Sequence, residues 1–162
     1  MNAIKKVLTP VSNVLDQVCS ALIVFMLGAM VIITGAQIVC RTWFTALSWS
    51  DEVTRYLLIW STFLGATVVY RHNGHISVTL LQDAVSPKMV KVLRVLVHVI
   101  CFVLFAVLLH YSSLYCMKLK KTATAMPIKM KYIYSCIPVS MAINMIHSLL
   151  MATEEATKEV KG

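Results

Sequence analysis

The feature that most constrains this chain is a set of long apolar segments that carry no charge. Residues 18–40 form a run of 23 without Lys, Arg, Asp or Glu, and residues 95–116 and 132–152 form runs of 22 and 21. A helix needs about 20 apolar residues to cross the hydrocarbon core of a bilayer. A fourth run, 57–70, reaches this length if its helix begins upstream near Asp51, at the level of the headgroups. The sequence therefore predicts an all-α integral membrane protein with four transmembrane helices.

The composition agrees with a bilayer as the surrounding solvent. Residues of the AVILMFWYC set make up 59% of the 162 residues, charged residues only 14%, and the mean hydropathy is +0.77. A soluble domain of this size could not bury that much apolar surface, and disorder is excluded for the same reason. We interpret the net charge of +8 as basic residues that flank spans and meet anionic headgroups, so membrane lipid is the expected partner and nucleic acid is not.

We treat residues 1–162 as one membrane domain. The predicted spans are residues 18–40, 51–70, 92–116 and 132–152. Ahead of them, segment 3–17 is predicted to form an amphipathic helix, because apolar residues fall on one helical face: Ile4, Val7, Leu8, Val11, Val14, Leu15 and Val18. Two arrangements stay open for this segment. It lies flat on the membrane with its lysines among the headgroups, or it extends the first span with Pro10 as a kink.

The distribution of basic residues does not decide the orientation. With the N-terminus inside, eight Lys and Arg lie inside and seven outside. Four spans place both termini on the same side. If that side is the cytoplasm, residues 117–131 face the periplasm with five lysines and no acidic residue, against the usual bias. These lysines are candidates for a docking surface, and the alternative is that they solvate lipid phosphates: Lys118, Lys120, Lys121, Lys129 and Lys131.

The histidines do not form a pattern typical of a metal or haem site. His72 and His75 form an H-x-x-H pair in a loop, but no third ligand is close in sequence. His98 and His110 are twelve residues apart, about 120° around a helix, so they do not share a face for haem ligation. Hydrogen bonding between helices is the expected role of the histidines within spans. We expect no cofactor and no metal in this chain.

Two spans carry faces suited to close helix contact. In the fourth span a polar stripe runs down one face: Cys136, Ser140, Asn144, His147 and Ser148. In the first span small residues recur along one side: Ser20, Gly28 and Gly35. The polar stripe packs within this bundle, or it offers Ser140, Asn144 and His147 to a partner subunit. No span centre holds Asp, Glu, Lys or Arg, so the chain is not expected to carry a substrate alone.

The most distinctive segment is residues 49–78, at the start of the second span. Ser50 can cap the helix, and Asp51 and Glu52 place negative charge on its N-terminal dipole. Arg55 follows Asp51 at the favourable i,i+4 spacing, and we expect these three charged residues to pair with one another or with another subunit. The aromatic residues suited to the membrane interface are Trp49, Tyr56 and Trp60.

Several motifs along the chain resemble those of one transporter family. They are Arg41 with Phe44, Trp49-Ser50-Asp51-Glu52, Arg55-Tyr56, Trp60, Leu64-Gly65-Ala66, Arg71, His75-Ile76, Met126-Pro127, Tyr132 and Ile137-Pro138. Together with the four-span layout, they make the chain similar to the small membrane subunit of tripartite ATP-independent periplasmic (TRAP) transporters, the DctQ/SiaQ type. The lysine-rich third loop departs from the family pattern.

The resemblance implies a subunit of the bacterial inner membrane that has both termini in the cytoplasm and is not an enzyme. It implies a complex with a large membrane subunit that holds the substrate and sodium sites, for which this chain is a static scaffold. It also implies docking of a periplasmic binding protein that delivers an organic acid, with sialic acid and C4-dicarboxylates as the family options.

A rival hypothesis is a four-span redox subunit, either a haem b and quinone protein or a thiol oxidase. It would use His98, His110 or His147, or a disulfide between Cys116 and Cys136, which lie near the two ends of the third loop. The sequence lacks facing histidine pairs and any C-x-x-C motif, which disfavours this class. A small drug exporter is a third hypothesis, disfavoured because no membrane carboxylate is present.

Overall fold

The computed structural model describes residues 2–43, 45, 47–73 and 87–157, with side chains from residue 8 onward except at 73, 87, 88 and 157. Over these residues the chain is almost entirely helical. The helices are α1 (Asn2–Trp43), α2 (Ser48–Asn73), α4 (Pro87–Lys118), α5 (Met130–Tyr134) and α6 (Cys136–Thr157). Four stretches are long and apolar enough to cross a membrane, with α5 and α6 counted as one: Leu8–Trp43, Ser48–His72, Met89–Lys118 and Met130–Ala156. The predicted all-α, four-span class is confirmed.

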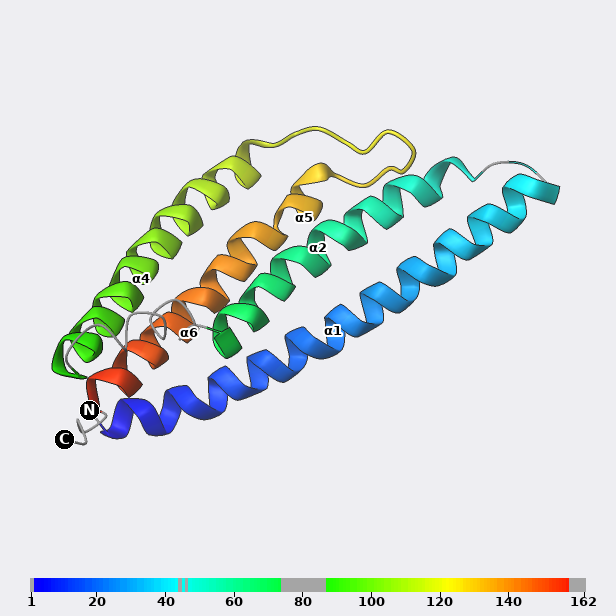
Figure 1. Cartoon of the computed structure of the whole chain (residues 1–162). Coiled ribbons are helices and arrows are strands. Elements are labelled where there is room, and N and C mark those ends of the chain that lie inside the picture. Colours follow the sequence, from blue (N-terminus) through cyan, green and yellow to red (C-terminus); the bar gives the residue numbers. More distant parts are fainter. Residues whose placement is uncertain (1, 44, 46, 74–86, 158–162) are drawn as a thin grey trace.

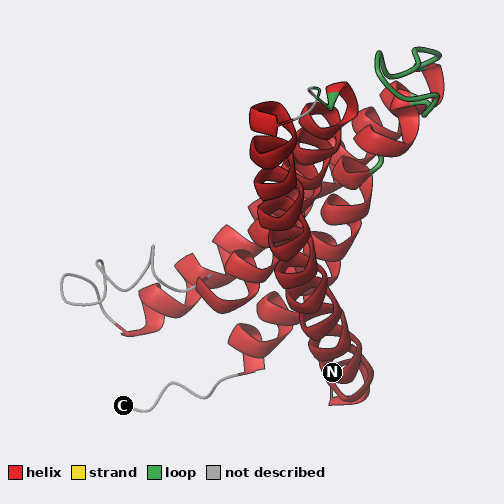
Figure 2. Ribbon diagram, turned by 90° about the vertical axis from the view of Figure 1, so that its right-hand side faces the viewer, coloured by secondary structure: helices red, strands yellow, loops and turns green. Residues whose placement is uncertain are grey.

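The helices lie side by side in the order α4, α6, α2, α1 (Figure 1). α6 packs against α4 and α2 and also touches α1, and it is the most buried of the four candidate spans. The start of α1 and the end of α6 lie at one end of the bundle, which we call the terminal end. The connection between α4 and α5 lies at the other end, which we call the loop end (Figure 2).

Polar side chains fill much of the interior, whereas large apolar side chains cover the outside. The buried polar residues include Ser12, Ser61, Thr67, His98, Ser140, Asn144, His147 and Ser148. The most exposed apolar residues of the first and third spans include Val24, Phe25, Val31, Ile32 and Val92. A soluble bundle has the opposite arrangement, with apolar side chains inside. The outer surface is therefore suited to lipid or to apolar protein, and the interior polar groups bond between helices.

The N-terminal segment continues the first span without a break. α1 runs through Pro10 as one helix, so the segment at 3–17 continues directly into the run at 18–40. Ser12 is fully buried against the bundle, whereas Val11, Val14 and Val18 are 44%, 59% and 51% exposed. The polar side of this segment therefore packs on the protein, and its apolar side faces outward.

The second helix begins earlier than predicted. α2 starts at Ser48, and the Ser50 hydroxyl donates a hydrogen bond to the Leu47 carbonyl at 2.7 Å. Ser50 is fully buried and lies inside the first turn. The prediction that Ser50 caps the helix was wrong. An N-cap side chain accepts a hydrogen bond from a backbone N–H two or three residues later in the helix, whereas the Ser50 hydroxyl donates to a carbonyl before it.

Candidate functional site

Polar contacts at the two ends of the bundle leave an uncharged layer between them. At the terminal end, His72 Nε2 lies 3.0 Å from Asp16 Oδ2. At the loop end, Gln37 Nε2 donates to Asp51 Oδ1 at 2.7 Å. Both contacts join α1 to α2, and the 20 residues between Asp16 and Gln37 correspond to about 30 Å of helix. That length matches the hydrocarbon core of a bilayer, about 30 Å.

At the loop end, the carboxylate of Glu52 holds the connection between α4 and α5. Thr124 N–H donates to Glu52 Oε1 and Ala125 N–H donates to Oε2, both at 3.0 Å. Hydrogen bonds to an ionised acceptor are stronger than neutral ones. Glu52 lies in the first turns of α2, so a residue of the second span fixes a loop that is more than 70 positions away.

This connection is a small hairpin. Thr122 pairs with Lys129 in an antiparallel bridge. The bridge is flanked by hydrogen bonds from Ala123 N–H to the Ile128 carbonyl, at 2.8 Å, and from Met130 N–H to the Lys121 carbonyl, at 2.9 Å. We call residues 119–129 the lysine hairpin. Ala123, a residue of the hairpin, is buried, so the hairpin rests on the bundle.

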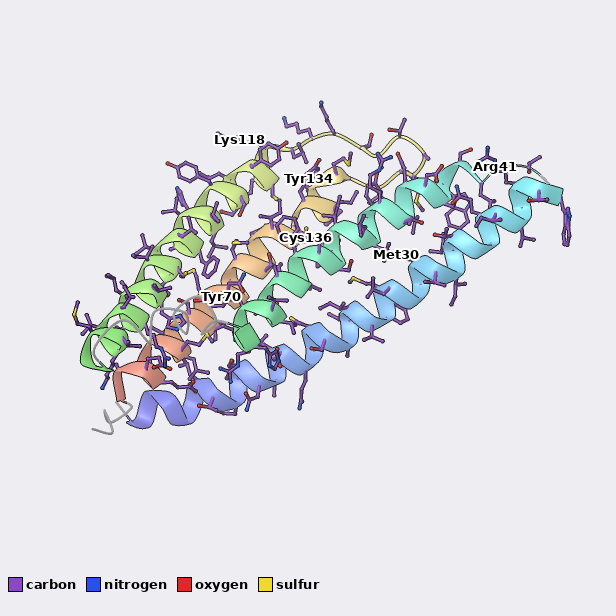
Figure 3. The ribbon with its side chains drawn as sticks, in the orientation of Figure 1. Met30, Arg41, Tyr70, Lys118, Tyr134 and Cys136 are labelled. Carbon is purple, nitrogen blue, oxygen red and sulfur yellow. The ribbon has the colours of Figure 1, made fainter. Side chains whose placement is uncertain are left out.

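Cationic side chains gather at the loop end, several of them in the lysine hairpin itself. The exposed ones are Lys118, Lys120, Lys121, Lys129, Arg41 and Arg55. Lys131 is half-buried, with its ammonium 5.0 Å from the centre of the Tyr132 ring. Lys118 and Arg41 lie toward the loop end, and Tyr70 lies toward the terminal end (Figure 3). The nearby carboxylates, Asp51 and Glu52, already accept the hydrogen bonds given above, so the loop end presents a positively charged surface.

The three charged residues at the start of α2 do not pair with one another. Asp51 bonds to Gln37 of α1, and Glu52 bonds to the lysine hairpin. Arg55 is exposed, and within the described part of the chain no ion pair links it to either acid. The partners of the two acids come from α1 and from the lysine hairpin, which the sequence did not predict.

At the terminal end, α1 is tied to two other helices. Arg71 Nη2 donates to Asn13 Oδ1 at 3.0 Å, next to the contact between His72 and Asp16. Ser12 Oγ lies 2.7 Å from His147 Nδ1, and both side chains are fully buried. Ser12, Asn13 and Asp16 were not predicted as a set, although their spacing of one and three residues places them on one helical side.

The other three helices meet one another in the same region. Tyr70 Oη of α2 lies 3.2 Å from His98 Nδ1 of α4, and Ser148 Oγ of α6 donates to the His98 carbonyl at 2.7 Å. Close by, Arg94 of α4 pairs with the buried Glu155 of α6 at 3.6 Å. We call the residues of these contacts and of the α1 ties the polar layer. It joins all four spans.

Two of the span histidines, His98 and His147, serve as hydrogen-bonding groups between helices. His98 bonds to Tyr70, and His147 bonds to Ser12. His110 is exposed, and its ring lies against that of Tyr111. Within the described residues, no group of three His, Cys, Asp or Glu could hold a metal ion. His75 lies outside the described residues.

The polar stripe of the fourth span packs inside this chain. Ser140 and His147 are fully buried and Asn144 is 3% exposed, so none of them offers surface to a partner subunit in this structure. Among the two interpretations of the stripe, packing within the bundle fits this burial. All five cysteines are free, so Cys116 and Cys136 are not joined.

The remaining motif residues lie along α2 and near the lysine hairpin. Trp49 is 42% exposed, and Trp60 is half-buried. Tyr56 Oη lies 4.0 Å from Met130 Sδ, at the end of the hairpin. Gly65 does not serve a close contact within the chain, because a Cβ atom built there meets nothing within 4 Å. Pro127 is exposed at the hairpin tip, and Pro138 is half-buried in α6.

Four apolar spans, a polar interior and charges confined to the two ends define a multi-pass membrane protein whose ionisable groups join helices. Residues 30–158 match the family model described as tripartite ATP-independent periplasmic transporters, DctQ component. The chain therefore belongs to the DctQ family, as its motifs indicated. It is a small permease subunit of a TRAP transporter, and the family is one of transporter components, not enzymes.

Two curated relatives are similar over part of their length. A protein of Haemophilus influenzae, named as a candidate TRAP transporter small permease, is 32% identical over 77 residues, which cover 47% of this chain and 48% of the relative. The C4-dicarboxylate TRAP transporter small permease DctQ of Vibrio cholerae is 31% identical over 99 residues, which cover 60% and 42%. The chain thus matches about half of each relative. Membership in a tripartite system implies other subunits as partners.

Proposed function

We propose that this chain is the accessory small subunit of a sodium-coupled TRAP transporter that imports an organic acid, and that it is a scaffold for the large membrane subunit. The polar layer carries this proposal. Its ionisable and polar groups bond to one another across all four spans, which fixes the helices relative to each other. A subunit built in this way is suited to remain still while another subunit moves.

The outer face of α1 is the proposed contact with the large subunit. Ten positions spaced alternately by three and four residues are all exposed: Val11, Val14, Val18, Ala21, Phe25, Gly28, Ile32, Gly35, Val39 and Thr42. This spacing is the heptad repeat of helices that cross at about 20°. Large residues alternate with small ones from Val18 to Val39, and small residues let helices approach closely in membranes. We propose that an apolar helix of the large subunit packs here and that lipid covers the other outer faces.

Substitution at the two glycines tests the proposed α1 contact. A Cβ atom at Gly28 or Gly35 meets nothing within 4 Å, so leucines there leave the chain's own packing intact. In the complex they would overpack the contact, which costs about 1–3 kcal/mol. We expect Gly28→Leu with Gly35→Leu to reduce co-purification of the large subunit by about tenfold. Ala66→Leu, at an exposed small residue of α2, is the control and should co-purify normally. Normal recovery of the double variant would refute this contact.

The proposed orientation places both termini in the cytoplasm, in the inner membrane of a bacterium. The loop end then faces the periplasm. We propose that its cationic surface contributes to docking of the periplasmic binding protein through an acidic patch on that protein. Exposed cations near the hairpin outnumber the two acids there, and both acids are occupied by hydrogen bonds. Complementary charge raises encounter rates between proteins.

The substrate and sodium sites are proposed to lie in the large subunit, and this chain is proposed to need no cofactor. The uncharged layer between the two ends of the bundle supports this assignment, since ion and substrate sites in membranes use ionisable or broken-helix segments. The Vibrio relative is named for C4-dicarboxylates, which supports that class of substrate, with sialic acid as the other option.

A further inference from the structure

The geometry at the tip of the lysine hairpin points to a role for Glu52. Its two oxygens accept from two consecutive amides, Thr124 N–H and Ala125 N–H, each at 3.0 Å. The backbone of the hairpin does not supply an acceptor for either amide, whereas Ala123 N–H and Ile128 N–H bond to carbonyls of the hairpin itself. Glu52 therefore completes the hydrogen bonding of the tip from outside the loop.

This arrangement also fixes where the hairpin lies on the bundle. Glu52 is in the first turns of α2, whose neighbour Asp51 is bonded to Gln37 of α1. Tyr56, one turn further along, contacts Met130 at the base of the hairpin. The start of α2 thus contacts the hairpin at its tip and at its base, and it is itself tied to α1.

Glu52 is a negative charge within a positively charged surface. A carboxylate among exposed lysines lowers the positive potential toward an acidic partner. A docking surface that relied on net charge alone would bind more tightly without it. The hydrogen bonds to the hairpin give a physical reason for a carboxylate at this position.

We propose that Glu52 is a positioning residue for docking of the periplasmic binding protein. Its carboxylate holds the hairpin in one shape, and so Lys120, Lys121 and Lys129 are presented in fixed positions. The positioning role rests on the docking function proposed above. A surface whose groups are already ordered binds more tightly, because less conformational entropy is lost on binding.

The test compares two carboxylates that are adjacent in sequence. Glu52→Gln and Asp51→Asn each remove one negative charge, and in Asp51→Asn the remaining carbonyl oxygen can still accept from Gln37. Glu52→Ala removes both hairpin bonds. Each variant is assembled with the large subunit in lipid nanodiscs, and hydrogen exchange is measured over residues 120–128. Binding of the cognate periplasmic protein is measured in parallel.

Glu52→Ala should speed exchange at the Thr124 and Ala125 amides by about tenfold, because each amide loses a hydrogen bond to a charged acceptor. Glu52→Gln should have a smaller effect, since one oxygen remains, and Asp51→Asn should have none. Glu52→Ala should raise the Kd of the binding protein by about two- to tenfold, the range expected for ordering a few groups. Asp51→Asn should leave the Kd unchanged or lower it.

Two results would overturn the positioning role. The first is unchanged exchange at the two amides in Glu52→Ala. The second is a Kd that falls in Glu52→Ala as it does in Asp51→Asn, which would mean that charge alone matters. A triple change of Lys118, Lys120 and Lys121 to Gln separates the two proposals. If it weakens binding while Glu52→Ala does not, docking stands and positioning fails. If it has no effect, the docking function fails and the positioning role with it.

Discussion

Single polar side chains hold the N-terminal part of α1 on the bundle. Ser12 and His147 are 135 positions apart in sequence, yet their side chains meet at 2.7 Å with no solvent exposure. The prediction that the span histidines form hydrogen bonds between helices is confirmed for His98 and His147. It does not hold for His110, which is exposed and lies against Tyr111 of its own helix. The sequence could not supply the partner of His147, because nothing in a single chain relates a serine near its start to a histidine near its end.

Ser12→Ala should destabilise the protein more than its size suggests. The change leaves His147 Nδ1 buried without its partner, and an unsatisfied buried polar group costs about 1–3 kcal/mol. We expect a lower melting temperature in detergent. Thr62→Ala is a suitable control, because Thr62 is exposed and its hydroxyl donates only to the Leu58 carbonyl of its own helix. Equal melting temperatures for the two variants would contradict a stabilising role for the bond.

The positions of the long helices were predictable from the uncharged runs. Which side of each helix faces the interior of the bundle was not predictable. Helical spacing shows that Val11, Val14 and Val18 lie on one side of α1. In a soluble protein that side would face the core. Here it faces outward, because the surroundings are apolar and the polar side finds its partners within the bundle. The same reversal explains why the polar stripe of α6 is internal.

The polar stripe of α6 contains residues of unequal importance. Ser148 Oγ donates to the His98 carbonyl of α4, whereas Asn144 Oδ1 is buried without a hydrogen-bond partner. Ser148→Ala should therefore lower the free energy of unfolding by about 0.6–2 kcal/mol, the range for bonds between membrane helices. Asn144→Leu should change it little, because it removes an unsatisfied group and keeps a similar volume. Thermal unfolding in detergent measures both, and a larger loss for Asn144→Leu would refute this ranking.

Across the whole molecule, the charged side chains lie in two layers at the ends of the bundle, and this separation bears on whether the chain could transport a substrate alone. Between the level of Asp16 and that of Gln37, the described residues include no Asp, Glu, Lys or Arg in α1, and the contacts of the polar layer lie at its terminal edge. The absence of ionisable residues from the span centres was visible in the sequence. The pairing of the end layers was not, since it depends on which helices are neighbours.

The isolated chain should not transport an organic acid. Coupled transport needs sites for sodium and substrate, and the uncharged layer offers neither. Liposomes that contain only this chain, with an imposed sodium gradient, should show no uptake of succinate or sialic acid above empty liposomes. Liposomes that also contain the large subunit and the binding protein are the positive control. Robust uptake by the chain alone would contradict the accessory role.

The cationic loop end gives the last prediction, which concerns the assembled transporter. Lys118, Lys120 and Lys121 are exposed at the start of the hairpin, where they can face an acidic partner or lipid phosphates. Long-range attraction between proteins is screened by salt, with a Debye length of about 8 Å at physiological ionic strength. Changing the three lysines to Gln should therefore slow uptake at low concentrations of the binding protein. Uptake should recover in part at high concentrations, and its dependence on salt should become weaker. Lys91→Gln, on α4 toward the terminal end, removes a charge away from the hairpin and should leave these three measures unchanged. Uptake by the triple variant that equals wild type at every concentration of binding protein would assign the lysines to lipid.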